Sequence, residues 1–185
     1  MSSSSSQLVI RDIQVCDAGE IATIYAQYVA DTTISFEETP PKIAEMADRI
    51  AAGTQHYPWV VAELDGTVVG YAYGSLHRAR PAYRWSVEVT VYVDRCAHRR
   101  GVGTRLYATL FERLRELGYH RAFSGIALPN ASSEALHCAV GFSRIGVFER
   151  IGYKFGTWHD VAWYQRDLQP PDTMPAELVR PDGCG

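Results

Sequence analysis

Apolar residues recur along the chain with two different periods. Short runs that are continuously apolar, or that alternate with polar residues, predict β-strands; they cover residues 8–11, 58–64, 67–74, 85–93, 122–127, 142–148 and 157–166. Apolar residues repeated at steps of three and four predict α-helices; these follow Asp17, begin at Thr39-Pro40-Pro41, cover 104–117, and run from Asn130 or Ser132 to Val140.

The first two predicted helices carry local signals. Asp17, with Glu20 three residues later, has the spacing of a capping box and is expected to start the first helix. In the second helix, Ile43, Met46 and Ile50 share one face, and this face is expected to point inward.

The order of these elements is βαα-ββ-β-αβα-ββ, which mixes hairpins with helical connections. Such an order predicts the α/β class, with a mixed sheet that is largely antiparallel at one side. One domain is expected over residues 8–168. Residues 1–7 form a serine-rich polar tail, and the proline-rich residues 169–185 are expected to be irregular.

Composition narrows the function classes. The 185 residues carry 18 Lys and Arg against 21 Asp and Glu, a net charge of −3, which disfavours a nucleic-acid partner. No apolar run reaches the ~20 residues of a membrane span, and no signal peptide opens the chain. A soluble cytoplasmic protein without a membrane partner is therefore expected.

The cysteines have no spacing typical of a zinc site, so we expect no metal. Unpaired cysteines suit a reducing compartment. Cys138, within the fourth predicted helix, is expected to be a small buried side chain. The four positions are Cys16, Cys96, Cys138 and Cys184.

The most informative segment joins the strand at 85–93 to the helix at 104–117. Gly101 and Gly103 would let the backbone curl closely around a ligand at the start of a helix, and Arg99 and Arg100 add positive charge. This pattern favours a pyrophosphate site over a plain turn. It is neither a P-loop nor a dinucleotide fingerprint, because the Lys-Ser/Thr ending and the third glycine are absent.

Glu88 is the one acidic residue inside the strand that leads to this loop. Alternation places it on one face with Ser86, Thr90 and Tyr92, and the valines between them on the other. The simplest interpretation is a solvated carboxylate. Because the strand feeds directly into the anion loop, we instead expect its face to line a cleft, where a carboxylate can act as a general base.

Together these segments resemble the GNAT superfamily of N-acetyltransferases, and within it the phosphinothricin or methionine sulfoximine N-acetyltransferase family. The superfamily's acetyl-CoA signature corresponds to residues 98–103, with His98 in place of the usual Gln or Arg. The family resemblance covers nearly all of residues 8–168. It rests on Ser35-Phe36, residues 78–83, residues 87–93, Leu128-Pro129-Asn130, Leu136-His137 before Gly141-Phe142, and residues 152–160.

The resemblance implies a GNAT fold with a splayed central strand and direct acetyl transfer from acetyl-CoA in a ternary complex. It assigns Glu88 as base, and His137 as a group that moves a proton or orients the substrate. It implies cofactor contacts from backbone amides near the end of the strand, the glycine loop and the start of the fourth helix; these residues are Val91, Tyr92, Val93, Arg99, Arg100, Gly101, Val102, Gly103, Thr104 and Asn130.

For the acceptor, the resemblance implies an amino-acid-like molecule held by a basic, aromatic segment and by the strand. The residues are Phe36, Arg78, Arg80, Tyr83, Glu88 and Thr90. Guanidinium groups suit the carboxylate and polar head of phosphinothricin or methionine sulfoximine. For Phe36 and Tyr92, packing in the core is an equal alternative. Relatives are commonly homodimers, so a homodimer is expected.

Two alternatives remain open. The enzyme could acetylate another amine, such as a different amino acid, a polyamine or a protein N-terminus, although the arginines favour an anionic acceptor. The chain could also be an acyl-CoA sensor without turnover, but a sensor would need neither Glu88 nor His137. No cysteine lies where a covalent acetyl-enzyme would need its nucleophile.

Overall fold

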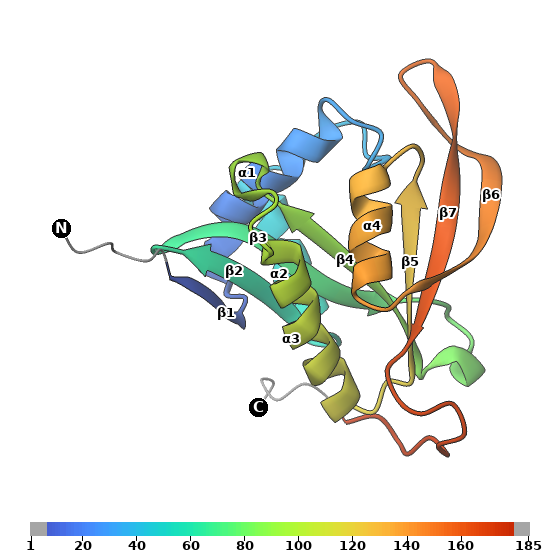
Figure 1. Cartoon of the computed structure of the whole chain (residues 1–185). Helices are drawn as coiled ribbons and strands as arrows, with labels where there is room; N and C mark the ends of the chain where they lie inside the picture. The colour runs from blue at the N-terminus through green and yellow to red at the C-terminus, as the bar shows by residue number, and fades with distance from the viewer. Residues whose placement is uncertain (1–6, 180–185) are drawn as a thin grey trace.

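The computed structural model describes residues 7–179, which contain one seven-stranded sheet in the order β1-β2-β3-β4-β5-β7-β6 (Figure 1). The strands are β1 (Leu8–Asp12), β2 (Trp59–Leu64), β3 (Thr67–Leu76), β4 (Ser86–Val93), β5 (Arg121–Ala127), β6 (Ser143–Lys154) and β7 (Thr157–Asp167). Neighbours are antiparallel except β4 and β5, which are parallel. The predicted α/β class with a mixed, mostly antiparallel sheet is confirmed.

Helices cover both faces of the sheet. On one face, α1 (Ala18–Val29) and α2 (Ile43–Thr54) pack against β2, β3 and β4. On the other, α3 (Val102–Glu116) and α4 (Ala131–Ala139) lie in front of the sheet as Figure 1 is drawn. Short 3₁₀ turns occupy Val15–Asp17, Pro81–Tyr83 and Arg95–Ala97.

The alternation predicted along β4 is confirmed by its packing. Val87 and Val89 are buried in the core under α3, and Val91 and Val93 pack against that core. Tyr92 points the other way and is buried with α1 and α2, in contact with Tyr25 and Tyr28. Of the two interpretations left open for the Tyr92 side chain, core packing is therefore the one observed.

The predicted splay of the central strand is also present. In residues 7–179, β4 and β5 pair over three positions, from Ser86↔Arg121 to Glu88↔Phe123. Beyond Glu88, β4 stays paired with β3 as far as Val93, whereas β5 continues beside β7. The edge of β4 that faces β5 is thus unpaired over its last five residues, and the two strands part there (Figure 1).

Several local expectations were wrong. Ile43 is 61% exposed, because it opens α2 beyond the contact with α1, which Met46 and Ile50 make. Cys138 is exposed, while its neighbour His137 takes the buried side of α4. The sixth strand runs past Phe148 to Lys154, with register shifts that interrupt the alternation.

The segment after β7 wraps back over the molecule. Residues 170–179 form no helix or strand, yet Leu178 packs against the main core, and the Trp85 indole N–H donates to the Ala176 carbonyl at 2.7 Å. Cys184 and residues 1–6 lie outside the described residues.

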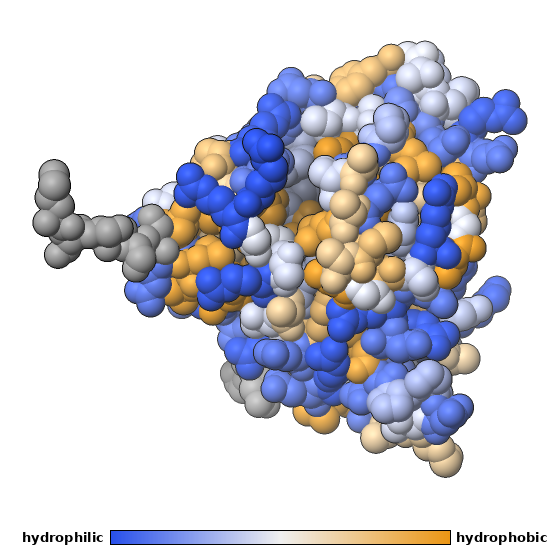
Figure 2. Space-filling view, viewed as in Figure 1, coloured by the Kyte–Doolittle hydropathy of each residue, from blue (hydrophilic) through white to orange (hydrophobic). Residues whose placement is uncertain are grey.

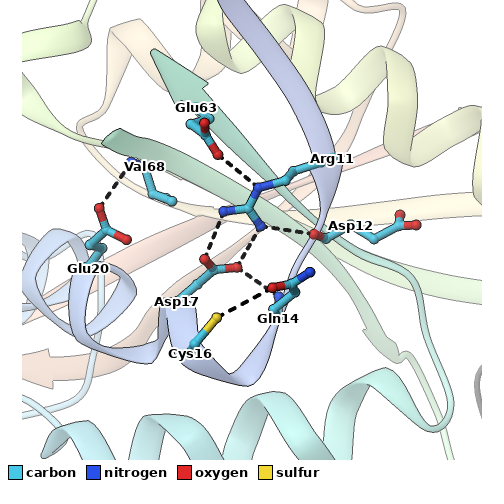
Figure 3. A network of polar contacts seen from close by, with 8 residues as sticks. All are labelled: Arg11, Asp12, Gln14, Cys16, Asp17, Glu20, Glu63 and Val68. Carbon is cyan, nitrogen blue, oxygen red and sulfur yellow. Dashed lines mark hydrogen bonds and ion pairs between the residues drawn. The ribbon is translucent and has the colours of Figure 1, made fainter. Parts of the chain in front are cut away.

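An ion pair to the buried Asp17 fixes the start of α1 to the sheet (Figure 3). The Arg11 guanidinium on β1 donates to both carboxylate oxygens of Asp17 at 2.8 Å and to Glu63 on β2 at 2.9 Å. The Gln14 backbone N–H donates to Asp17 at 2.7 Å. Asp17 was expected to cap α1, but its side chain caps the preceding 3₁₀ turn instead, and Glu20 accepts from the Val68 backbone N–H.

These contacts control the ionisation of Asp17. Burial alone would raise the pKa of this carboxyl, but the hydrogen bonds from Arg11 and Gln14 outweigh burial, and the pKa is lowered. A carboxyl with a lowered native pKa stabilises the fold fully above the pKa of an unfolded aspartate, about 3.9, and this contribution is lost as the pH falls through the native pKa.

We predict that Asp17→Asn lowers the free energy of unfolding by about 2 kcal/mol at pH 7, since charged hydrogen bonds are lost. The difference from wild type should shrink as the pH is lowered from 5 toward 2. Urea unfolding across that range measures both effects, with the exposed Asp12→Asn as control. A difference that stays constant down to pH 2 would contradict the assignment.

Candidate active site

Two cavities lie on either side of the place where β4 and β5 part. The first, which we call the acceptor pocket, has a volume of about 390 Å³. Its lining comes from the end of β3, from β4 and β5, and from the β6–β7 hairpin; the residues are His77, Arg78, Glu88, Phe123, Ile145, Gly146, Phe148 and Trp163. Glu88 and Phe123 are register partners, so the pocket lies on the α1/α2 face of the sheet, where these helices leave it uncovered.

The polar groups of the acceptor pocket cluster at one end. The His77 Nδ1 atom lies 3.0 Å from Glu88 Oε1, and the Arg78 guanidinium lies 5.8 Å from the centre of the Tyr83 ring. The Glu88 side chain is 32% exposed. A carboxylate and a guanidinium therefore face a cavity whose other walls are aromatic or aliphatic.

The second cavity, which we call the loop pocket, has a volume of about 330 Å³ and is lined mainly by β4, the glycine loop and the start of α4. Its lining residues are Tyr28, Ile34, Val91, Val93, Ala97, His98, Arg99, Gly101, Val102, Gly103, Thr104, Asn130, Ser132, Ser133 and Leu136. Figure 2 shows the surface hollowed between the start of α3 and α4, in the view of Figure 1.

The glycine loop has the backbone that its sequence predicts. Gly101 caps α3 with a φ of 74°, and a Cβ there would have open space around it, so the backbone is accessible from outside. Arg99 also has a positive φ, 59°. The first turn of the 15-residue α3 therefore opens its unpaired N–H groups and positive dipole end into the loop pocket.

At Gly103 a close contact with a neighbouring helix, and not a positive φ, favours glycine. A Cβ at this position would lie 2.9 Å from Leu136 Cδ2, which is closer than side chains pack. Gly103 thus allows α3 and α4 to approach at the floor of the loop pocket. The sequence signal was interpreted as close approach of a phosphate; the structure adds this helix–helix contact.

Side chains around the loop pocket hold its backbone in place. Asn130 Oδ1 accepts from the Ser133 backbone N–H at 3.2 Å, which confirms Asn130 as the cap of α4. The Tyr28 hydroxyl and His98 both bind the Val93 carbonyl. The buried Lys154 ammonium donates to the carbonyls of Val29, Thr32 and Ser35 at 2.7–2.9 Å, and so ties β6 to the loop that carries Ile34.

Several predicted site residues lie outside both linings. Arg100 is exposed beside the loop pocket, and Arg80 and Tyr83 are exposed beside Arg78. Thr90 lies on the same face of β4 as Glu88 but does not reach the acceptor pocket. Phe36 is 38% exposed and packs over Gly152, 6.2 Å from the His159 ring.

His137 is buried between α3, α4 and β5 and lines neither cavity. Its Nδ1–H donates to the Ser133 carbonyl at 2.8 Å, and Nε2 lies 2.9 Å from the Tyr107 hydroxyl and 3.0 Å from that of Ser124. Burial lowers the pKa of this imidazole, against an opposite effect of the Ser133 hydrogen bond. His137 is therefore a neutral ring with both nitrogens engaged.

His77 is the residue that the sequence interpretation missed. A signal was present: antiparallel pairing of β3 with β4 sets Ser75 opposite Glu88, so His77, two residues further, falls on the same face and diagonal to Glu88. The register needed for this step could not be read from the sequence alone.

The two cavities make a transfer across the sheet possible. Val91 and Val93 line the loop pocket, on the side of α3, and Glu88 lines the acceptor pocket, on the opposite face. The unpaired stretch of β4 lies between them. Within residues 7–179 no group of three or more His, Cys, Asp or Glu side chains could hold a metal ion. None of the helices described here has both the length and the apolar character of a membrane span.

A sheet that parts beside a glycine loop at the start of a helix is the architecture of a GNAT-type acetyltransferase. The family model for the acetyltransferase (GNAT) domain matches residues 10–163, and the chain belongs to this family.

Relatives with established names agree with this placement. The chain is 37% identical over 181 residues to phosphinothricin N-acetyltransferase of Streptomyces viridochromogenes, with 98% of each chain covered. It is 37% identical over 168 residues to an L-methionine sulfoximine/L-methionine sulfone acetyltransferase of Pseudomonas paraeruginosa, covering 90% of this chain and 98% of the relative.

A solved structure is similar over nearly the whole chain. The phosphinothricin acetyltransferase of Sinorhizobium meliloti, in complex with AcCoA, superposes with a TM-score of 0.88 at 40% identity, covering 95% of this chain and 96% of that one.

We predict that Gly103→Val weakens acetyl-CoA binding by about 10- to 100-fold, because overpacking costs about 1–3 kcal/mol and the displaced Leu136 lines the same pocket. Calorimetric titration with coenzyme A measures the effect. Gly19→Ala, where a Cβ meets nothing within 4 Å, is the matched control. Unchanged affinity in a folded Gly103 variant would remove the loop from the binding site.

Proposed function

We propose that the chain is an acetyl-CoA-dependent N-acetyltransferase that acetylates the amino group of a small amino-acid-like molecule of the phosphinothricin or methionine sulfoximine type, by direct transfer in a ternary complex. The proposal rests on the position of Glu88. This residue lines the acceptor pocket at the point where β4 and β5 part, and the loop pocket lies on the other side of that gap.

The loop pocket fits acetyl-CoA. The accessible backbone around Gly101 and the first turn of α3 suit the pyrophosphate, with charge from Arg99 and, outside the lining, from Arg100. The unpaired edge of β4 offers backbone groups along Val91–Val93 to the pantetheine arm, with Asn130 opposite. Val102, Gly103 and Thr104 complete this set of proposed contacts.

The acceptor pocket fits an amino acid with a compact head. Arg78 offers a fork of N–H donors to a carboxylate or a tetrahedral oxygen group, while Phe123, Phe148 and Trp163 supply apolar walls for a methyl-bearing side chain. Arg80 and Tyr83 lie beside Arg78, and we include them among the residues proposed to bind the acceptor, together with Thr90 and Phe36, which lie outside the pocket lining. The activities for which the Streptomyces viridochromogenes and Pseudomonas paraeruginosa relatives are named support this acceptor class.

The chemistry assigned to the chain is one proton transfer and one charge stabilisation. Acetyl-CoA supplies the activated acetyl group. The Glu88 carboxylate takes a proton from the acceptor ammonium, directly or through water: an N–H bond breaks, an O–H bond forms, and the nitrogen lone pair becomes available for the acetyl carbon. Amides near Val91–Val93 polarise the thioester carbonyl. The C–N bond forms as the thioester C–S bond breaks, and coenzyme A leaves as a thiolate that takes up a proton.

His137 is proposed to act by orienting the residues that it contacts. Because both ring nitrogens are engaged, the neutral imidazole holds Ser133, which lines the loop pocket, and Tyr107 in fixed positions. This favours the orienting role over direct proton transfer.

We propose that the enzyme is a cytoplasmic homodimer. Exposed apolar side chains on β6, in its turn into β7 and at the start of β7 support a subunit contact there; they are Ile145, Phe148, Ile151, Tyr153, Phe155 and Trp158. Figure 2 shows part of this apolar surface along the edge formed by β6. The exposed, unpaired Cys16, Cys96 and Cys138 are compatible with a reducing compartment.

Glu88→Gln is predicted to lower kcat/KM by about 10²–10⁴ with acetyl-CoA affinity unchanged, because glutamine keeps the size but cannot accept the proton. Much of the loss should be recovered at high pH, where the acceptor amine is deprotonated in solution. Steady-state kinetics from pH 6 to 10 tests this, with the exposed Glu116→Gln as control. A profile that overlays wild type would show that the base lies elsewhere.

Release of the coenzyme A thiol with a panel of amines tests the acceptor class. We expect phosphinothricin or methionine sulfoximine to give a higher kcat/KM than polyamines. Arg78→Ala should cost about 1.5–3 kcal/mol of acceptor binding, as one charged hydrogen bond does. Arg80→Ala should cost less, and Arg113→Ala on distant α3 nothing. Turnover of polyamines alone would contradict the proposed class, and thiol release with no amine in the panel would favour the sensor alternative.

A further inference from the structure

An imidazole lies beside the proposed base. His77 follows β3 directly, and its Nδ1 atom is 3.0 Å from Glu88 Oε1. The His77 side chain is 11% exposed, against 32% for Glu88, so histidine is the buried member of the pair. Among residues 7–179, Glu88 Oε2 has no hydrogen-bond partner. One carboxylate oxygen is therefore held, and the other remains available in the acceptor pocket.

Aromatic rings from three elements fix the orientation of this imidazole. It stacks on Phe123 of β5, with ring centres 4.3 Å apart and planes 6° apart. Trp163 of β7 and Tyr83 of the Pro81–Tyr83 turn meet it edge-on, each 6.3 Å away. A ring that is clamped in this way presents Nδ1 to one position, which is where the Glu88 carboxylate lies.

Resting on the proposed function of Glu88, we infer that His77 is a positioning residue for the base. Its Nδ1–H holds Oε1 and thereby sets the rotamer in which Oε2 meets the acceptor ammonium. The carboxylate ends a flexible side chain, and a misplacement of about 1 Å can cost up to about 10²-fold in rate.

One charged group faces His77, and a second is its neighbour in the chain. Glu88 faces it from β4, Arg78 is its neighbour in the chain, and Tyr83 contacts it from the 3₁₀ turn. Phe123 and Trp163, from β5 and β7, carry no charge.

Three variants separate positioning from packing. His77→Phe keeps the flat ring on Phe123 but removes the donor. His77→Leu also removes the donor and fills the site with an aliphatic side chain. His77→Asn can place an N–H near the position of Nδ1 and so restores the donor. His56→Asn, at an exposed site after α2, is the control.

We expect His77→Phe and His77→Leu to lower kcat by roughly 10- to 100-fold with the KM for acetyl-CoA unchanged. His77→Asn should recover most of kcat. In a Glu88→Gln background, His77→Phe should have little further effect, because His77 acts through Glu88.

Each other outcome overturns the inference in a distinguishable way. If Glu88→Gln leaves kcat unchanged, the proposed base is wrong and the role of His77 falls with it. If Glu88→Gln lowers kcat but the folded His77→Phe or His77→Leu enzyme matches wild type, His77 does not position the base. A loss of equal size in the wild-type and Glu88→Gln backgrounds, or no recovery in His77→Asn, would mean that the ring only fills space.

Discussion

Parallel pairing between β4 and β5 stops after Glu88 and Phe123, and the proposed site depends on this break. A continuous sheet would separate the two faces completely, since side chains and backbone hydrogen bonds fill it. Here β4 is held by β3 through Val93, while β5 is held by β7, so both strands remain ordered although they no longer pair with each other. The break leaves backbone groups of β4 available and connects the faces. It sets the loop pocket and the acceptor pocket beside one strand, within a few residues of Glu88.

Packing and hydrogen bonds hold the elements on both sides of the break. On one side, Gly103 allows α3 to approach α4 through Leu136, and Asn130 fixes the start of α4. On the other side, Lys154 binds the Val29 carbonyl at the end of α1 and two carbonyls of the loop that follows, in a buried position where unpaired carbonyls would be costly. Burial lowers the pKa of Lys154, with Glu38 and Glu37 acting in the opposite direction. The walls of the two cavities thus come from elements far apart in the sequence, from α1 to β7.

Much of this arrangement could be predicted from the sequence, because hydrophobic periodicity and glycine spacing are local properties. The strands, the helices, the face of Glu88 and the loop around Gly101 follow from them. What failed depended on neighbours far away in the chain. Periodicity marked Ile43 as apolar but could not show that α1 ends its contact at Met46. The register shifts in β6 interrupt its alternation, so the sequence pattern predicted a strand that is too short. The approach of His77 to Glu88 requires the β3–β4 register and rings from β5 and β7, none of which is local.

The central claim is that acetyl donor and acceptor meet from opposite faces at the gap between β4 and β5. A crystal structure with coenzyme A and N-acetylated phosphinothricin or methionine sulfoximine tests it most directly. The account predicts the pyrophosphate at the start of α3, the pantetheine arm along Val91–Val93, and the acetylated nitrogen within hydrogen-bond reach of Glu88, directly or through one water. A product bound on the same face as the coenzyme, or with its nitrogen far from Glu88, would contradict it.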